Sequence, residues 1–335
     1  MTTPAASTLS PPTDTTPPPR PAYLRALDRF REDWHSYVIY IGFALIFVLF
    51  AVLLHNKGFL TSNNLLNIVR QTATISVMAV AMTFVIACAE IDLSVGSVAG
   101  LSSVVTAMAV THYGLFAGIA AGIGVGFVVG IINGGLVTML NIPSFLVTLG
   151  MLGIAVGVAQ WITSSAPQPI LNDQFNTIFG SGDIGRVPGL LIWAAAAVTL
   201  GAVVMAKTSF GRKVLATGGN RVAAEFTGIN TRRIKFTVMV VMSVVAALAG
   251  MLYAGRLQSG RFQWGTGDEL SVIAAVILGG TSLFGGSGRV IGSLFGALLI
   301  GLINNALILA GLDTSQQQVV RGVIIIVSVA LARRK

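Results

Sequence analysis

The amino-acid sequence predicts an all-α fold, a polytopic transmembrane helical bundle with about ten membrane segments. Hydrophobic residues make up 54% of the chain and charged residues only 10%, whereas ordinary globular domains carry about 25% charged residues. The apolar residues gather in runs close to the ~20 residues that a helix needs to cross a bilayer. A basic stretch at 207–235 lies between two such uncharged runs, Pro188–Ala206 and Phe236–Gly255. This contrast indicates a loop between membrane helices.

The first 34 residues differ in composition from the rest. Seven of the eleven prolines lie within the first 21 positions, with Ser and Thr between them. Pro-rich polar sequence cannot bury a core, so we expect a disordered cytoplasmic tail at 1–34. A single transmembrane domain at 35–335 should follow. The stretch Leu53-Leu54-His55-Asn56 lacks the small residues of a cleavage site, so the first apolar run should remain as a membrane anchor.

Ten hydrophobic segments then follow in order, several of them short or rich in glycine. The short and the glycine-rich segments are candidates for broken or tilted helices. The approximate ranges are 36–54, 72–89, 93–112, 115–137, 141–163, 188–206, 236–255, 269–285, 290–311 and 319–332. Gly-x-x-x-Gly pairs, which let helix backbones approach closely, occur at 96/100, 118/122, 126/130, 153/157 and 292/296. We expect these pairs to serve packing within one chain, with a dimer seam as the alternative.

The distribution of Lys and Arg predicts the orientation. With the N-terminus inside and ten alternating segments, fifteen Lys or Arg lie inside and five outside, leaving Arg321 uncounted near the start of the last segment. An excess of cations inside is what the positive-inside rule requires. We therefore expect both termini, and the stretch 207–235, in the cytoplasm.

Several classes of function are excluded by the residues present. The cations lie at loops and ends with no continuous basic face, which argues against nucleic-acid binding. No phosphate-binding loop of the G-x-x-x-x-G-K-[ST] type occurs, and no Ser/His/Asp or Cys/His set is expected to converge, so the chain is not expected to be an enzyme. Cys88 is the single cysteine, which excludes an internal disulfide. The three histidines, His35, His55 and His112, lack metal-ligand spacing. We expect no bound metal or cofactor.

The stretch 207–235 should contain a short surface helix. Asn220 is a suitable N-cap, Arg221 to Thr227 can form about two turns, and Gly228 is placed to end them. Gly218 and Gly219 allow a tight entry. Val222, Phe226 and Ile229 share one face by their spacing. That apolar face either rests on lipid or docks into a groove of a cytoplasmic partner.

Four stretches resemble one family, the bacterial ABC-type sugar permeases of the ribose-transport class. They are ATGGNRVAAEFTGI in the basic stretch, NNLLNIVRQTATISVMAVAMTFVI at 63–86, EIDLSVGSVAGL at 90–101, and GTGDELSVIAAVILGGTSLFGGSGRVIGSLFGALLIGLINNAL at 265–307. The resemblance runs from about residue 58 to about 331 and leaves out only the Pro-rich tail.

The resemblance implies a function and a set of partners. The chain would be the permease subunit of an importer in the bacterial cytoplasmic membrane, multi-pass and bathed in membrane lipid, carrying a ribose-like monosaccharide. A separate ABC ATPase subunit would use the ATP, an extracytoplasmic sugar-binding protein would deliver the solute, and a second permease copy would complete the pathway. The helix that couples to the ATPase subunit would be built on Gly219, Asn220, Ala223, Ala224 and Gly228.

Polar residues in or beside membrane segments have two readings. Glu90 and Asp92 either line the translocation pathway or stabilise the start of the next helix, and helix capping is favoured. Asp268 and Glu269 have the same two readings. Asn304 and Asn305 either bond between helices or line a wet path. The family form has Gly-Gly where this chain has Ala89-Glu90, which puts the role of Glu90 in doubt.

Other functions stay open. The same architecture serves permeases for amino acids, nucleosides or sugar-like signals. An ion-driven secondary transporter would need membrane-buried acids, for which Glu90 and Asp92 are the credible pair. A non-transporting scaffold or receptor is disfavoured because no sizeable soluble domain is present.

Overall fold

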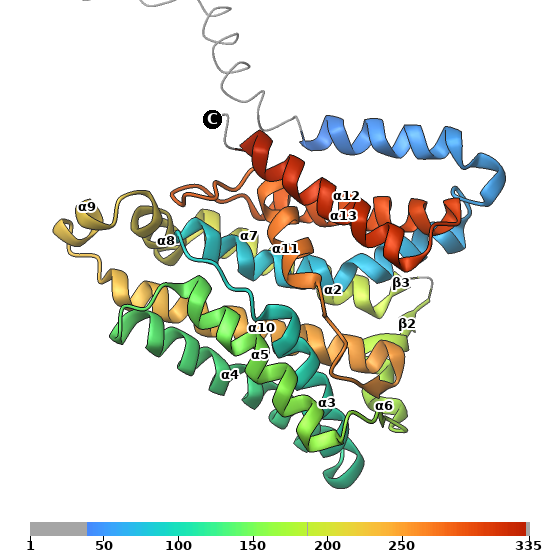
Figure 1. Ribbon diagram of the computed structural model, residues 1–335, viewed down its shortest axis with the longest axis horizontal. Coiled ribbons are helices and arrows are strands. Elements are labelled where there is room, and N and C mark those ends of the chain that lie inside the picture. The colour runs from blue at the N-terminus through green and yellow to red at the C-terminus, as the bar shows by residue number, and fades with distance from the viewer. Residues whose placement is uncertain (1–38, 186, 333–335) are drawn as a thin grey trace, which may run out of the picture.

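The computed structural model describes residues 39–185 and 187–332, which fold into a bundle of long helices (Figure 1). Within these residues seven helices are long and apolar enough to cross a membrane. They are α2 (Ser62–Ala87), α3 (Val95–Tyr113), α4 (Leu115–Met139), α5 (Ser144–Thr163), α7 (Gly189–Lys207), α10 (Thr231–Leu257) and α12 (Val290–Ala310). The all-α prediction is confirmed. The number of spans and the location of the termini stay predictions, and the tail at 1–34 lies outside the described residues.

Shorter elements connect or extend these helices. A 15-residue apolar helix, Ile39–Leu53, precedes them. The others are η1 (His55–Lys57), α6 (Asp173–Asn176), the π-helical turn η2 (Thr177–Ser181), α8 (Ser209–Gly219), α9 (Arg221–Phe226), α11 (Asp268–Leu278) and α13 (Thr314–Ala332). Two antiparallel pairs of two-residue strands complete the described chain, β1 (Gln168–Pro169) with β4 (Ser259–Gly260) and β2 (Asp183–Ile184) with β3 (Val187–Pro188). Each of the ten predicted segments overlaps one helix.

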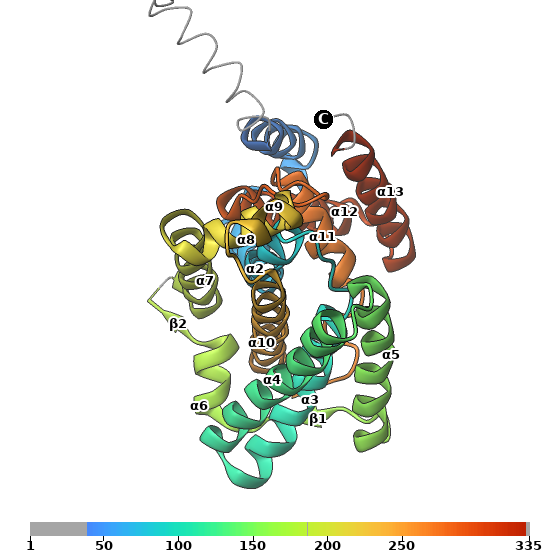
Figure 2. The ribbon, with the colours of Figure 1, turned by 90° about the vertical axis from the view of Figure 1, so that its left-hand side faces the viewer.

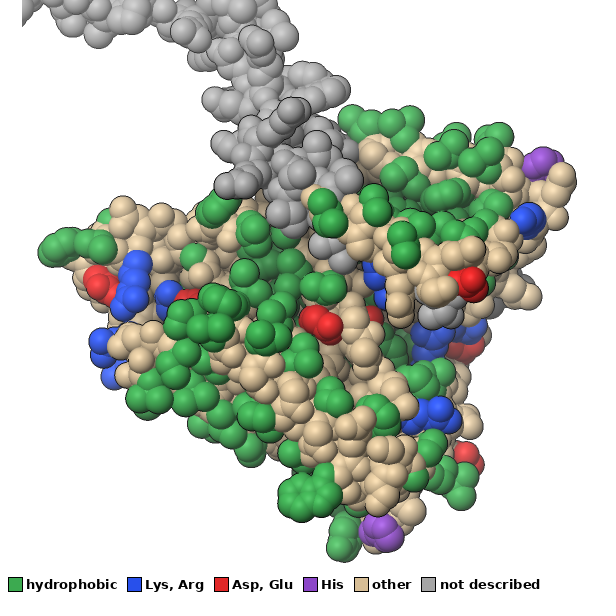
Figure 3. All heavy atoms as spheres, in the orientation of Figure 1, with side chains coloured by type: hydrophobic (Ala, Val, Ile, Leu, Met, Phe, Trp, Pro, Cys, Tyr) green, Lys and Arg blue, Asp and Glu red, His purple; other side chains and the backbone are tan. Residues whose placement is uncertain are grey.

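Helices α2 and α10 form the centre of the bundle. Every residue of α2 from Thr72 to Ala87 is buried, as expected for a helix that is enclosed on all sides. Helix α10 packs against α2, α3 and α4. Figure 2 shows α10 between α7 on one side and α3, α4 and α5 on the other, with α13 at the edge. Hydrophobic side chains cover much of the outer face in Figure 3, while Lys and Arg gather toward its two ends.

Glycines allow the closest helix contacts. A Cβ atom on Gly126 would lie 2.7 Å from the Ser243 carbonyl oxygen of α10, and one on Gly130 would lie 2.7 Å from Val240 Cα. The pairs at 96/100, 118/122 and 292/296 are likewise crowded by neighbouring segments of the same chain. The pair Gly153/Gly157 on α5 meets no atom within 4 Å. Four of the five pairs therefore pack within one chain.

Three segment boundaries differ from the sequence prediction. Helix α2 begins at Ser62 rather than near 72, because the Thr61 hydroxyl caps it. Helix α10 begins at Thr231 rather than 236, because the Asn230 side chain accepts a hydrogen bond from the Arg233 N–H and caps it. The segment predicted at 269–285 is helical only to Leu278, because the chain turns at Gly279 and Gly280, the latter with φ 89°.

Candidate functional site

Helices α8 and α9 project from one end of the bundle (Figure 1). The Asn220 side-chain oxygen accepts a hydrogen bond from the Ala223 N–H at 3.0 Å, so Asn220 caps α9 as its sequence position indicated. Gly228, with φ 83°, ends the turn that follows. Gly218 and Gly219 are the last residues of α8 rather than a separate entry turn. Gly218 is needed there because a Cβ atom would lie 1.9 Å from the Ala87 carbonyl oxygen.

The outer face of α9 is apolar and exposed. Phe226 is 88% exposed and Val222 is 62% exposed, while Ala223 is also exposed. Ala224 is only 4% exposed and lies on the inner side. Ile229 is partly buried against the main core cluster and does not join the exposed face, contrary to the spacing argument. The surface offered outward is therefore narrower than predicted, and Phe226 dominates it.

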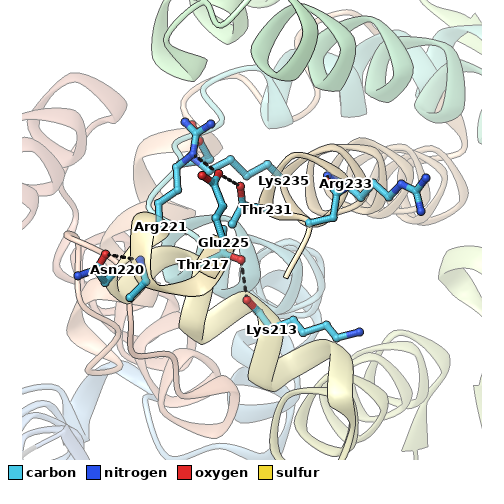
Figure 4. A network of polar contacts seen from close by, with 11 residues as sticks. Lys213, Thr217, Asn220, Arg221, Glu225, Thr231, Arg233 and Lys235 are labelled. Atoms are coloured by element: carbon cyan, nitrogen blue, oxygen red, sulfur yellow. Dashed lines mark hydrogen bonds and ion pairs between the residues drawn. The ribbon is translucent and has the colours of Figure 1, made fainter. Parts of the chain in front are cut away.

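One side-chain contact within α9 and a second one to the first turn of α10 both involve Glu225 (Figure 4). Arg221 Nε donates to Glu225 Oε1 at 3.0 Å, and the Thr231 hydroxyl donates to the same oxygen at 2.5 Å. The hydrogen bond from Thr231 and then that from Arg221 lower the pKa of the Glu225 carboxyl below its usual range. The carboxylate therefore stays ionised at neutral pH, and α9 is held to α10 by it.

An ion pair joins the start of α10 to the turn between α2 and α3. Lys235 Nζ donates to Glu90 Oε1, and their side chains are 16% and 10% exposed. Arg221 and Arg232 line the same cavity of about 150 Å³ as this pair. The structure gives Glu90 an ion-pair partner, while its two predicted roles, lining the translocation pathway or capping the next helix, stay predictions. Its partner was missed because it lies 145 residues away in the chain.

The turn after Glu90 is held by side chains from two further helices. Asp92 is fully buried, and its Oδ1 accepts from the Ser94 N–H at 2.8 Å and from the Ser94 hydroxyl at 2.6 Å. The Ile91 and Leu93 N–H groups donate to hydroxyls on α5, and Asn133 of α4 donates to Ser94 Oγ. Asp92 thus orders the start of α3 from two residues before the formal N-cap, Ser94.

Two of the predicted polar residues of α11 and α12, Asn305 and Asp268, bond to other helices. Asn305 and Asn64 exchange two amide hydrogen bonds of 2.9 and 3.0 Å, which join α12 to α2. Asn304 is half-buried. Asp268 and Glu269 are the first residues of α11, whose N-cap is Gly267 without a side-chain bond. The hydroxyl of Tyr253 donates to Asp268 Oδ2 at 2.5 Å.

The described residues contain no group of three or more His, Cys, Asp or Glu side chains close enough to hold a metal ion. An apolar cavity of about 380 Å³ opens between α2, α7 and α10. The basic cavity beside Glu90 is smaller and polar. These features leave the exposed face of α9, and the polar contacts behind it, as the candidate functional site.

Comparisons with known proteins give one consistent result. Residues 64–329 match the family described as branched-chain amino acid transport system / permease component. The chain is 40% identical to a probable ABC transporter permease protein of Escherichia coli, YphD, over 85% of this chain and 86% of that protein. It is 38% identical to the ribose import permease protein RbsC of Escherichia coli, over 87% of this chain and 92% of RbsC. An L-arabinose ABC transporter permease protein of Azospirillum brasilense, AraH, is 35% identical over 86% of each chain. No solved structure shows significant similarity.

Proposed function

Because the chain belongs to the branched-chain amino acid transport system / permease component family, we propose that it is the membrane-spanning permease subunit of an ABC importer for a monosaccharide. Relatives named as ribose and L-arabinose permeases support the solute class. The seven long apolar helices fit a multi-pass protein of the cytoplasmic membrane. Amino acids, nucleosides or sugar-like signals are the alternative solutes.

The proposal assigns no catalytic step to this chain. A separate ATPase subunit hydrolyses ATP, an extracytoplasmic sugar-binding protein delivers the solute, and a second permease copy completes the pathway. We place both termini and α9 in the cytoplasm, because the excess of Lys and Arg on that side favours this orientation. The chain's own task is to change between outward-open and inward-open states according to the state of the ATPase subunit.

The observation that carries the proposal is the exposed apolar face of α9. Phe226 and Val222 stand on a helix that is capped by Asn220 and fastened through Glu225 to α10. A rigid, projecting apolar helix fits a groove on a partner protein. We propose that α9 docks in the ATPase subunit, so that closure of the two ATPase subunits moves α10 and the turn bonded to it at Glu90.

Phe226→Asp tests the docking. The variant should lose binding to the ATPase subunit, because it places a charge in an apolar groove, yet it should fold normally because Phe226 is 88% exposed. Co-purification of the two subunits from membranes measures the interaction, and thermal unfolding in detergent measures the fold. Ala224→Asp is the contrasting variant. Ala224 is buried, so its replacement should lower the unfolding temperature itself.

Normal recovery of the ATPase subunit with Phe226→Asp would contradict docking through α9. The solute is identified separately, by calorimetry of the cognate binding protein with ribose, arabinose, amino acids and nucleosides. Binding of an amino acid or nucleoside in place of a sugar would replace the solute and leave the ABC assignment intact.

A further inference from the structure

Helix α11 spans only half the depth that its neighbour spans. The 21 residues of α12 extend about 31 Å and the 11 residues of α11 about 16 Å, at 1.5 Å per residue. A Cβ atom on Gly292 would meet the Gly279 carbonyl oxygen, and one on Gly296 would meet that of Ala275. These contacts place α11 antiparallel to the first half of α12. The start of α11 therefore lies in the interior of the membrane region, since α12 is one of the apolar spans.

The remaining depth is covered by chain that is not helical. Residues 259–267 contain the strand β4 and a series of turns. They run along α3, where Gly260 contacts Ser103, and where Gly100 and Gly96 lie against the carbonyls of Phe262 and Gly265. The Ser103 hydroxyl donates to the Arg261 carbonyl oxygen at 3.0 Å. Because α3 is itself a span, this segment lies at membrane depth.

Polar side chains on this segment are accessible. Arg261, Gln263 and Thr266 are exposed, and Trp264 and Glu269 are half-buried. Irregular backbone and polar side chains at membrane depth do not face lipid, and they occur only where protein buries them or where they line water. Figure 3 shows acidic side-chain atoms in the middle of the face, where α11 begins. The surface around the start of α11 therefore requires water or a solute.

We propose that residues 259–269 line the solute pathway and that Gln263, Thr266 and Glu269 hydrogen-bond the hydroxyl groups of a neutral sugar. An amide and a hydroxyl both donate and accept, and a carboxylate accepts, which is the set that a polyol requires. Trp264 lies beside them, with the Arg261 guanidinium 5.4 Å from its ring centre, and supplies an apolar surface. Tyr253 holds Asp268, and with it the first turn of α11, against α10. This inference rests on the proposed function and names its solute site.

Accessibility to water is the first test. Thr266→Cys and, as a lipid-facing control, Leu200→Cys each introduce a thiol, and the native Cys88 is buried. Leu200 is 67% exposed on α7, on the opposite side of the bundle from α5 (Figure 2). The complete transporter is treated with a charged, membrane-impermeant thiol reagent in two states, with ATP and without ATP. The reagent should modify Thr266→Cys in at least one of these states. It should leave Leu200→Cys unmodified. Absence of modification at Thr266→Cys in both states would overturn the proposal.

Sugar recognition is the second test. In ATP-driven ribose uptake with the binding protein present, Gln263→Ala should lower kcat/KM by about threefold to tenfold, the effect of one lost hydrogen bond. Gln263→Asn should restore part of it. Gln258→Ala, the same change at an exposed residue beside the segment, should leave uptake unchanged. All three variants should have the unfolding temperature of the unaltered protein. A loss of uptake at an unchanged unfolding temperature separates solute contact from a structural role.

The outcomes also separate this inference from the function on which it rests. If the unaltered complex carries ribose and Gln263→Ala carries it equally well, the solute site is wrong and the importer stands. If the unaltered complex shows no ATP-driven sugar uptake, the proposed function fails, and modification of Thr266→Cys then reports only a water-lined path.

Discussion

Ala89 has a backbone conformation that glycine adopts more readily. Its φ is 58°, and it directly precedes Glu90 in the turn between α2 and α3. A left-handed conformation costs a residue with a Cβ atom about 1–2 kcal/mol relative to glycine.

Ala89→Gly should therefore stabilise the protein by about 0.5–1 kcal/mol, after the added freedom of the unfolded chain is subtracted. Thermal unfolding in detergent measures the change. Ala81→Gly, in the middle of α2, is the control and should destabilise the protein because the helix loses a good helix former. Equal destabilisation by both changes would show that Ala89 is not strained.

At the residue scale, local chemistry was predictable and distant partners were not. The Asn220 cap and the Gly228 stop follow from hydrogen-bond capacity and backbone freedom within a few residues of each position, and both were predicted. The contacts of Glu90 with Lys235 and of Asn305 with Asn64 join residues 145 and 241 positions apart. Complementary charge was the available signal for Glu90, but a sequence with seven cations in one stretch does not say which cation approaches.

At the element scale, one polar path connects α9 to the helices behind it. Glu225 binds Thr231 at the start of α10, and Lys235, one turn further on, pairs with Glu90. The chain after Glu90 is bonded to α4 and α5. The Glu90–Lys235 pair is the most buried of the ion pairs found among the described residues, and we expect it to transmit movement of α9 and α10.

Glu90→Gln should cost about 3 kcal/mol of stability, because it leaves Lys235 without a partner in a largely buried position. The charge exchange Glu90→Lys with Lys235→Glu should restore most of that loss. Thermal unfolding measures the stability, and the number of ATP molecules hydrolysed per sugar carried measures the coupling. We expect the single variant to waste ATP and the exchange to recover the ratio.

The exposed pair Arg70–Asp183 provides the control for that comparison. Its side chains are 34% and 38% exposed, so Asp183→Asn should change stability by less than about 1 kcal/mol and leave the ratio unchanged. If Glu90→Gln lowers stability while the ATP ratio stays normal, the pair is structural only and does not carry the coupling.

Helix α4 depends on glycine at positions facing α10. Gly130→Ala should destabilise the protein by about 1–3 kcal/mol, because the added methyl would lie 2.7 Å from Val240 Cα. Gly135→Ala is the matched change on the same helix, where nothing lies within 4 Å, and it should be neutral or slightly stabilising. The unfolding temperatures of the two variants, measured side by side, test whether α4 packs closely on α10. Equal values would contradict close packing of α4 on α10.

The extent of each element could be predicted only in part. Apolar composition located all ten segments, since each overlaps a helix. The starts of α2 and α10 were missed because both helices begin in polar sequence and depend on the capping residues Thr61 and Asn230. The short length of α11 was missed because the chain past Leu278 continues without a charged residue, while tertiary contacts of Gly279 with α12 decide where the chain turns.

At the scale of the whole molecule, the fold class follows from the apolar composition. The proposed mechanism depends on the difference between the two ends of the bundle. Hydrophobic side chains cover much of the face in Figure 3, acidic atoms lie in its middle where α11 begins, and cationic residues gather toward its ends. The end that bears α8 and α9 also holds the Glu90–Lys235 pair. The broken span at 259–278 reaches the interior from the opposite end. The proposed solute path and the proposed docking helix are thus separate regions joined by α10.

ATP-driven sugar uptake by a reconstituted transporter tests the account most directly. The chain is placed in liposomes with its ATPase subunit and sugar-binding protein, and uptake of labelled ribose is followed with an uncoupler present. We predict uptake that requires ATP, persists with the uncoupler and is lost with Phe226→Asp. Uptake driven by an ion gradient without ATP, or full uptake by Phe226→Asp, would contradict the account.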